Sequence, residues 1–142
     1  MSKSLGNVVR IRDALKDYSA QELRLYFAGF HYREPVVMTT PALKKARITL
    51  KMLSKELNTF RECQSTQKPL KNKRLNQLTT KFEKDFRQHM NDDFDTPNAL
   101  KDLLSYVAYL SSYRKSKRID VRSKERVEAV IQRISNVIGI SI

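Results

Sequence analysis

The chain has 142 residues, with 28 lysines and arginines against 15 aspartates and glutamates, and a formal net charge of +13. Its single cysteine, Cys63, excludes an intramolecular disulfide, and no cysteine–histidine cluster offers the four ligands of a structural zinc site, so we expect no metal. Neither a signal peptide nor an apolar run of about 18 residues is present, so we expect no membrane contact and a cytoplasmic protein with a reduced thiol.

The excess of positive charge favours a polyanionic partner, and nucleic acid is the usual one. Two other interpretations stay open at this point. Basic helical faces can serve solubility alone, or they can bind an acidic protein.

The chain opens with the heptapeptide MSKSLGN, residues 1–7. A lysine between two hydroxyls, close to a glycine that lets backbone approach a ligand, suits a phosphate group. The single glycine is far from the pattern of a Walker loop, which makes the signal weak by itself. The alternative is a frayed terminus whose serines cap a helix.

Only three glycines and four prolines interrupt the chain, and its apolar residues recur at spacings of three and four, which predicts an all-α protein. We expect a short helix over residues 13–18. A second helix begins with a capping box formed by Ser19 and Glu22. It ends near residues 31–33, because Pro35 cannot continue it. Its apolar face is expected to hold Leu23, Tyr26, Phe27 and Phe30.

The next helix is long and starts at Thr40, as N-cap, and Pro41. Its apolar side chains form one seam: Leu43, Ala46, Leu50, Leu53, Leu57 and Phe60. Cys63 lies at or just past the end of this helix, where a structural thiol is the favoured interpretation. A basic connection without an apolar repeat follows over residues 64–73.

Three further helices follow the basic connection. The first carries Leu75, Leu78, Phe82, Phe86 and Met90. The second starts at Thr96-Pro97 and carries Leu100, Leu103, Leu104, Val107 and Leu110. The last carries Val127, Val130, Ile131, Ile134, Val137 and Ile138 and ends at Gly139. Long seams of this kind pack as bundles, so we expect a short helical subdomain over residues 1–39 and an antiparallel helical bundle over residues 40–142.

Two groups of cations are candidates for following RNA phosphates. The candidates are Lys44, Lys45, Arg47, Lys51 and Lys55 on the long helix, and Arg114, Lys115, Lys117 and Arg118 near the end of the helix that starts at Thr96-Pro97. For any single member, a solvated surface position is the alternative interpretation.

Tyr106, Tyr109 and Tyr113 recur at helical spacing and are compatible with stacking on RNA bases, although the edge of an amphipathic core explains them as well. The acidic group of Asp92, Asp93 and Asp95 lacks the spacing of a calcium loop. We therefore expect Asp95 or Thr96 to cap the following helix and the other two aspartates to pair with cations of a neighbouring element.

Three stretches carry a resemblance to a known family. MSKSLGN resembles the end of the Lys-Met-Ser-Lys-Ser signature loop of class I aminoacyl-tRNA synthetases and its downstream Leu-Gly-Asn. Residues 10–33, RIRDALKDYSAQELRLYFAGFHYR, resemble the helices that follow this loop in cysteinyl-tRNA synthetases. Residues 86–100, FRQHMNDDFDTPNAL, are similar to the phrase Met-x-Asp-Asp-Phe-x-Thr-Pro-x-Ala in the same enzymes.

The resemblance implies that the chain is the carboxy-terminal part of such an enzyme, with a stem-contact subdomain followed by an anticodon-binding-type bundle. Met1, Ser2, Lys3 and Ser4 would contact ATP, with Lys3 stabilising the phosphates in the transition state. The partners implied are tRNA(Cys), cysteine and ATP. The motif's first lysine is absent from the sequence.

The family's His-Ile-Gly-His motif and its zinc site, which reads the cysteine thiol, are also absent from these 142 residues, and His31 and His89 are too isolated to replace that motif. We therefore expect Lys3 to act only together with a Rossmann catalytic domain and the chain alone to be inactive. Two other hypotheses remain at this point. One is a freestanding basic RNA- or partner-binding module. The other is the related ligase that joins cysteine to an amino-sugar inositol.

Overall fold

The computed structural model describes residues 10–68, 70, 72–113 and 118–142. Within these residues the chain is all-α, as the sequence predicts, with six helices: α1 (Ile11–Asp17), α2 (Ala20–Ala28), α3 (Thr40–Arg61), α4 (Lys73–Asn91), α5 (Thr96–Leu110) and α6 (Val121–Ile138). Two short strands, β1 (Ser65–Thr66) and β2 (Ile119–Asp120), pair in parallel, with Ser65 opposite Ile119. None of the described helices combines the length and the apolar character that a membrane span requires.

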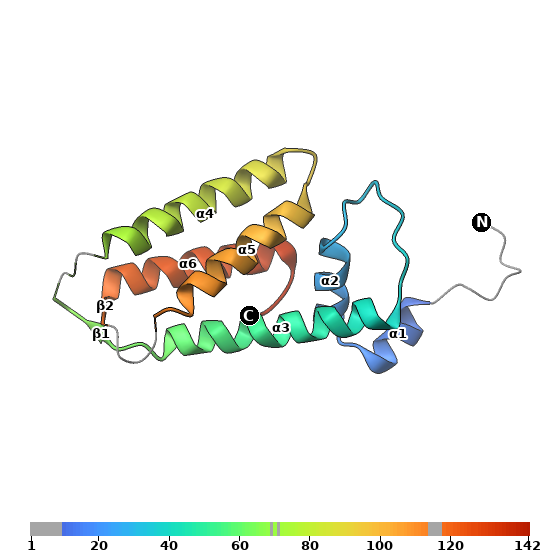
Figure 1. Cartoon of the computed structure of the whole chain (residues 1–142), viewed down its shortest axis with the longest axis horizontal. Coiled ribbons are helices and arrows are strands. Elements are labelled where there is room, and N and C mark those ends of the chain that lie inside the picture. Colours follow the sequence, from blue (N-terminus) through green and yellow to red (C-terminus); the bar gives the residue numbers. More distant parts are fainter. Residues whose placement is uncertain (1–9, 69, 71, 114–117) are drawn as a thin grey trace, which may run out of the picture.

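Helix α3 is the longest element and runs along one side of the molecule, past α5 and α2 (Figure 1). One part of it packs against α2, and another part packs against α5, which in turn contacts α4. Helix α6 packs on α4. The strand pair joins the chain just after α3 to the segment that leads into α6, and so closes one end of the bundle.

The core consists of two clusters of buried side chains. The larger cluster lies between α3, α4, α5 and α6, with Leu25 added from α2, and Leu53, Leu75, Leu103 and Leu110 are fully buried within it. The smaller cluster joins α1 and α2 to the first turns of α3. Its buried members are Ala14, Leu23, Tyr26, Leu43 and Ala46. Helix α3 therefore contributes to both clusters.

The capping residues predicted for α2 and α5 are confirmed, and the N-cap of α3 lies one residue earlier than predicted. Ser19 and Glu22 form the capping box, in which the Ser19 amide donates to Glu22 Oε2 over 2.8 Å and the Glu22 amide donates to Ser19 Oγ over 3.2 Å. The N-cap of α3 is Thr39 and not Thr40, since the Ala42 amide donates to the Thr39 hydroxyl. Asp95 caps α5.

Three expectations about helix ends and faces are wrong. Helix α2 ends at Ala28, before residues 31–33, and Gly29 caps it. Phe27 and Val137 are exposed, although they were expected on apolar faces. In contrast, Gly139 ends α6 in the left-handed conformation at φ 75°, as its position predicts.

Candidate nucleic-acid interface

Four lysines of α3 are exposed, and three of them lie on the side of the helix away from the core. Lys44, Lys51 and Lys55 are separated by seven and four residues, so they lie in one row on a helix of 3.6 residues per turn. Lys45 is exposed beside this row. Within the described part of the chain, no carboxylate lies at ion-pair distance from any of the four. We call these four residues the α3 lysine row.

Arg47 lies on the same helix but has a different environment. Its Nε lies 2.8 Å from Glu22 Oε1, its guanidinium also donates to the carbonyl of Asp17, and its Cζ stands 4.6 Å from the centre of the Tyr18 ring. The hydrogen bond from Arg47 is the main reason why the pKa of Glu22 is lowered. Arg47 therefore fastens α1 and α2 to α3, while the lysines beside it have no such contacts among the described residues.

The second predicted basic group is described only at its end. Arg118 is exposed and directly precedes β2. Arg114, Lys115 and Lys117 lie outside the described residues, as do the four residues expected at ATP, Met1, Ser2, Lys3 and Ser4.

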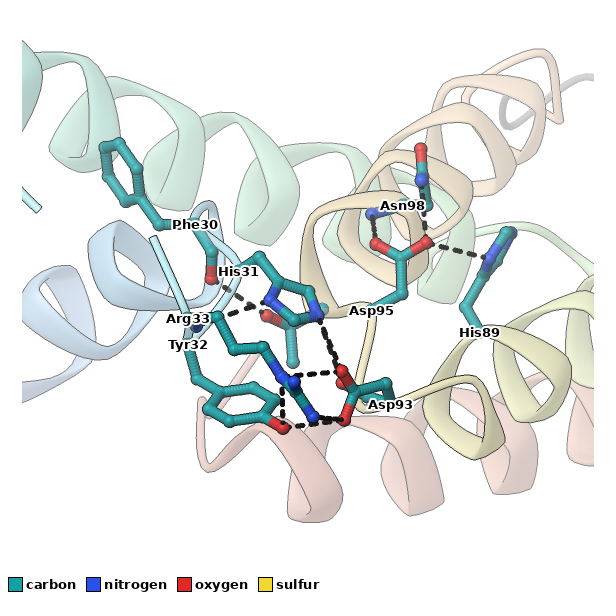
Figure 2. A network of polar contacts seen from close by, with 9 residues as sticks. Phe30, His31, Tyr32, Arg33, His89, Asp93, Asp95 and Asn98 are labelled. Atoms are coloured by element: carbon teal, nitrogen blue, oxygen red, sulfur yellow. Dashed lines mark hydrogen bonds and ion pairs between the residues drawn. The ribbon is translucent and has the colours of Figure 1, made fainter. Parts of the chain in front are cut away.

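Two of the three segments that carry the resemblance, residues 10–33 and 86–100, meet in a polar network (Figure 2). The Tyr32 hydroxyl donates to Asp93 Oδ1 over 2.6 Å, and Arg33 Nε lies 2.9 Å from Asp93 Oδ2. His31 Nε2 lies 3.1 Å from the Asp93 carbonyl oxygen. The hydrogen bond from Tyr32, reinforced by Arg33, keeps the pKa of Asp93 below its ordinary value. This network locks the chain after α2 to the turn between α4 and α5.

The same turn has an unusual backbone. Asp93 and Phe94 both adopt the left-handed conformation, with φ angles of 51° and 52°, and the Phe94 side chain is 62% exposed. Asp95 follows and accepts two hydrogen bonds from Asn98, through the backbone amide at 3.2 Å and the side-chain amide at 2.7 Å. No cluster of three or more possible metal ligands occurs in the described residues.

The two histidines contact aspartates of this region. His89 lies between two carboxylates, with Nδ1 at 3.5 Å from Asp95 Oδ2 and Nε2 at 3.2 Å from Asp102 Oδ2. Asp93 pairs with Arg33, as the sequence predicts, but the same prediction for Asp92 is not borne out, since no ion pair of Asp92 occurs among the described residues. The sequence does not predict the contact between His31 and Asp93, because 62 residues separate them.

The tyrosines at helical spacing contribute to the core and its edge. Tyr106 is 5% exposed and stacks on Phe82, with ring centres 4.4 Å apart, and its hydroxyl lies 2.7 Å from Thr79 Oγ1. Burial raises the pKa of Tyr106 to about 12. Tyr109 and Tyr113 are half-buried against the same core cluster. These positions support the core-edge interpretation over base stacking.

Cys63 is buried, as expected of a structural thiol. It is 3% exposed, and its Sγ donates to the carbonyl of Tyr113 over 2.8 Å. The thiol therefore links the end of α3 to the segment that follows α5.

Two family models match the chain. One, described as the tRNA synthetases class I (C) catalytic domain, matches residues 1–48, and the other, described as a DALR domain, matches residues 85–142. They match the two ends of the chain, and each includes one of the segments that meet at Asp93.

Curated proteins named cysteine–tRNA ligase match along nearly the whole chain. The protein from Wigglesworthia glossinidia brevipalpis is 31% identical over 140 residues, which is 99% of this chain and 27% of that protein. The protein from Pyrobaculum calidifontis is 32% identical over 143 residues, covering 99% of this chain and 30% of that protein. The protein from Lactobacillus gasseri is 28% identical over 142 residues, with shares of 99% and 30%.

The chain thus spans less than a third of the length of these three relatives. The two family models, the named relatives and the helical architecture agree with one another. The chain belongs to the cysteinyl-tRNA synthetase family and corresponds to its carboxy-terminal portion.

Proposed function

We propose that the chain serves the ATP-dependent attachment of cysteine to its tRNA, as the tRNA-binding helical part of a cysteine–tRNA ligase. The observation that carries this proposal is the α3 lysine row, four exposed cations of which three lie on the side of the helix away from the buried seam. The names of the relatives support the choice of tRNA as the polyanion.

The geometry of the row suits a nucleic-acid backbone. From Lys44 to Lys55 it extends about 16 Å along the helix axis at the usual rise per residue. Cations spread over this length contact several phosphates of one strand, and such contacts position an RNA without reading its sequence. We propose that Arg118 and the basic residues before it in the sequence, Arg114, Lys115 and Lys117, also contact RNA phosphates.

In this proposal Arg47 has a mainly structural role. Its guanidinium is engaged by Glu22, Asp17 and Tyr18, and its side chain is 35% exposed. We assign it the task of holding α1 and α2 beside the lysines, with only its exposed edge facing the RNA.

The salt dependence of binding tests this function. We expect the chain to bind tRNA(Cys) weakly, with an affinity that falls by several powers of ten for each tenfold rise in salt concentration, because each phosphate contact releases counterions. Replacing Lys44, Lys45, Lys51 and Lys55 by glutamine should lower the log–log slope by about 3 to 4. Fluorescence anisotropy of labelled tRNA over a salt series measures both slopes.

A matched control removes the same net charge elsewhere. Glutamine at Lys16, Lys73, Lys81 and Lys84, which are exposed on α1 and α4, should leave the slope within about 1 of the original value. Equal losses in the two quadruple variants, or no binding at low salt, would refute the proposed surface.

For the ATP-dependent step, we propose that Lys3 of the MSKSLGN segment binds the ATP phosphates, with Met1, Ser2 and Ser4 beside it. An ammonium group near the phosphates stabilises charge that develops during adenylate formation. The Rossmann catalytic domain would supply the nucleotide pocket and the zinc ion that binds the cysteine thiol. The 142 residues alone are then inactive.

Pyrophosphate exchange with cysteine tests both parts of this proposal. The isolated chain should show no exchange above background. In a cysteine–tRNA ligase that contains these residues, Lys3→Ala should lower the exchange rate by about 100-fold or more, as loss of an electrostatic contact in a transition state does. Exchange by the isolated chain, or an unchanged rate in the Lys3→Ala enzyme, would contradict it.

A further inference from the structure

A groove with a volume of about 390 Å³ is lined by residues of α2, α3 and α5 and of the segment after α2. Small side chains line it on α3, including Ala46 and Thr49, and leucines line it on α5, including Leu104. Its volume lies near the lower end of the range for small-molecule pockets in proteins. The groove is therefore large enough for one flat ring system and too small for an extended ligand.

Two aromatic rings that are held in place close the groove, Tyr26 of α2 and Phe30 in the segment after α2. The Tyr26 hydroxyl donates to the carbonyl of Val37 over 2.8 Å, which fixes the orientation of its ring. The Phe30 ring meets Tyr26 edge to face, with centres 5.1 Å apart. Figure 2 shows the Phe30 ring directed away from the polar network, while its carbonyl accepts from the Thr96 hydroxyl at 3.3 Å. The aromatic wall is thus preformed.

The charged side chains at the groove have one sign. Lys45 lines it from α3 and Lys101 from α5, and both are exposed. No carboxylate belongs to its described lining. Lys45 is also a member of the α3 lysine row, so the groove adjoins the proposed RNA surface. An apolar slot flanked by two cations is complementary to a flat apolar group that carries negative charge on both sides.

We propose that this groove receives one unstacked base of a bound RNA, with the phosphates on either side of that base contacting Lys45 and Lys101. The proposal rests on the RNA-binding function proposed above and adds a base-binding site to it. Charge complementarity selects a nucleotide as the occupant. Contacts to an aromatic and aliphatic wall tolerate any base, because every base has an apolar face.

Two hexamers with equal charge separate base contacts from phosphate contacts. Hexauridylate and an abasic hexamer of the same backbone are titrated with the chain, each carrying the same dye on a 3′ linker. We expect hexauridylate to bind about tenfold more tightly, because contacts of one base with aromatic side chains contribute that much.

Filling the groove should remove this preference. Thr49→Leu and, as a second variant, Ala42→Leu place extra carbon atoms at half-buried positions of the groove wall. Both should bind the two hexamers equally and keep the affinity for the abasic hexamer. Thr59→Leu makes the same exchange on α3 at a position that does not line the groove, and it should keep the tenfold preference.

The outcomes distinguish the two proposals. Equal binding of both hexamers by the original chain, or a preference that survives both filling variants, would overturn the base site and leave the lysine surface intact. Failure to bind either hexamer or tRNA at low salt would overturn both. Equal binding of the hexamers together with tight, Thr49→Leu-sensitive binding of an acidic amphipathic peptide would assign the groove to a protein and overturn this proposal.

Discussion

Arg47 differs from the other basic residues of α3 in its contacts, and therefore in the role that we assign to it. Five of the six basic residues of α3, from Lys44 to Lys55, look equivalent in the sequence, yet only Arg47 meets a carboxylate, a backbone carbonyl and an aromatic ring among the described residues. The periodicity of α3 places Arg47 beside the buried seam rather than opposite it. This difference arises because α2 packs beside Arg47. The sequence of α3 alone does not predict that packing.

Glu22→Gln tests the Arg47 contact. Glutamine keeps an oxygen for the capping box but removes the charge that faces Arg47, so the free energy of unfolding at pH 7 should fall by about 1 kcal/mol for this partly exposed pair. Arg47 lowers the pKa of Glu22 from its ordinary value of 4.5. The extra stability is therefore present above pH 4.5 and is lost as the pH falls through the pKa of the folded state.

Urea unfolding of both proteins at pH 7, 5 and 3 measures this difference. The gap between them should close at the lowest pH. A gap that is absent at pH 7, or that widens on acidification, would contradict the assigned contact.

At the scale of single elements, the turn between α4 and α5 holds two successive residues in the left-handed conformation, Asp93 and Phe94. For a residue with a Cβ this conformation costs roughly 1–2 kcal/mol, while glycine adopts it freely. The contacts of Tyr32 and Arg33 with Asp93 stabilise the turn in this strained form. The strain is located where the two family segments meet.

Substitutions at Phe94 measure this strain. Phe94→Gly should be more stable than Phe94→Ala by about 1 kcal/mol, because only glycine relieves the strain. At the exposed helical position Ala129, Ala129→Gly should instead be destabilising by about 1 kcal/mol. Thermal unfolding of the variants provides the comparison. An alanine variant as stable as the glycine variant at position 94 would show that the backbone there is not strained.

The helices themselves are largely predictable from spacing and capping residues. The sequence does not decide between Thr39 and Thr40 as the N-cap of α3, because both offer the same hydroxyl just before Pro41. Val137 has the right spacing but is exposed. The backbone reverses at Gly139, whose amide and the amide of Ile140 both donate to the Ser135 carbonyl, and Ile140 enters the core instead.

At the scale of the whole molecule, one long helix connects two hydrophobic clusters, and each cluster includes residues matched by a different family model. Apolar spacing predicts the helices but not which of them meet, since that depends on pairs of faces far apart in the sequence. The contact of Tyr32 with Asp93 is such a case. The division at residue 39 remains a prediction.

The two parts of the candidate site differ in how well the sequence predicts them. The α3 lysines follow from the helical period, because a buried seam through Leu53 and Leu57 leaves Lys44, Lys51 and Lys55 on the other side. The sequence does not predict the groove between α2, α3 and α5, since its wall combines Ala46 of α3 and Leu104 of α5 with Phe30, which follows α2.

Lysine footprinting tests the central claim, that tRNA binds on the α3 lysine row, most directly. The chain is acetylated briefly with and without saturating tRNA(Cys) at low salt, and modification of each lysine is read by mass spectrometry. We expect tRNA to slow acetylation of Lys44, Lys45, Lys51 and Lys55 severalfold and to leave Lys16 and Lys84 unchanged. Equal protection of all these lysines, or protection confined to Lys16 and Lys84, would contradict the account.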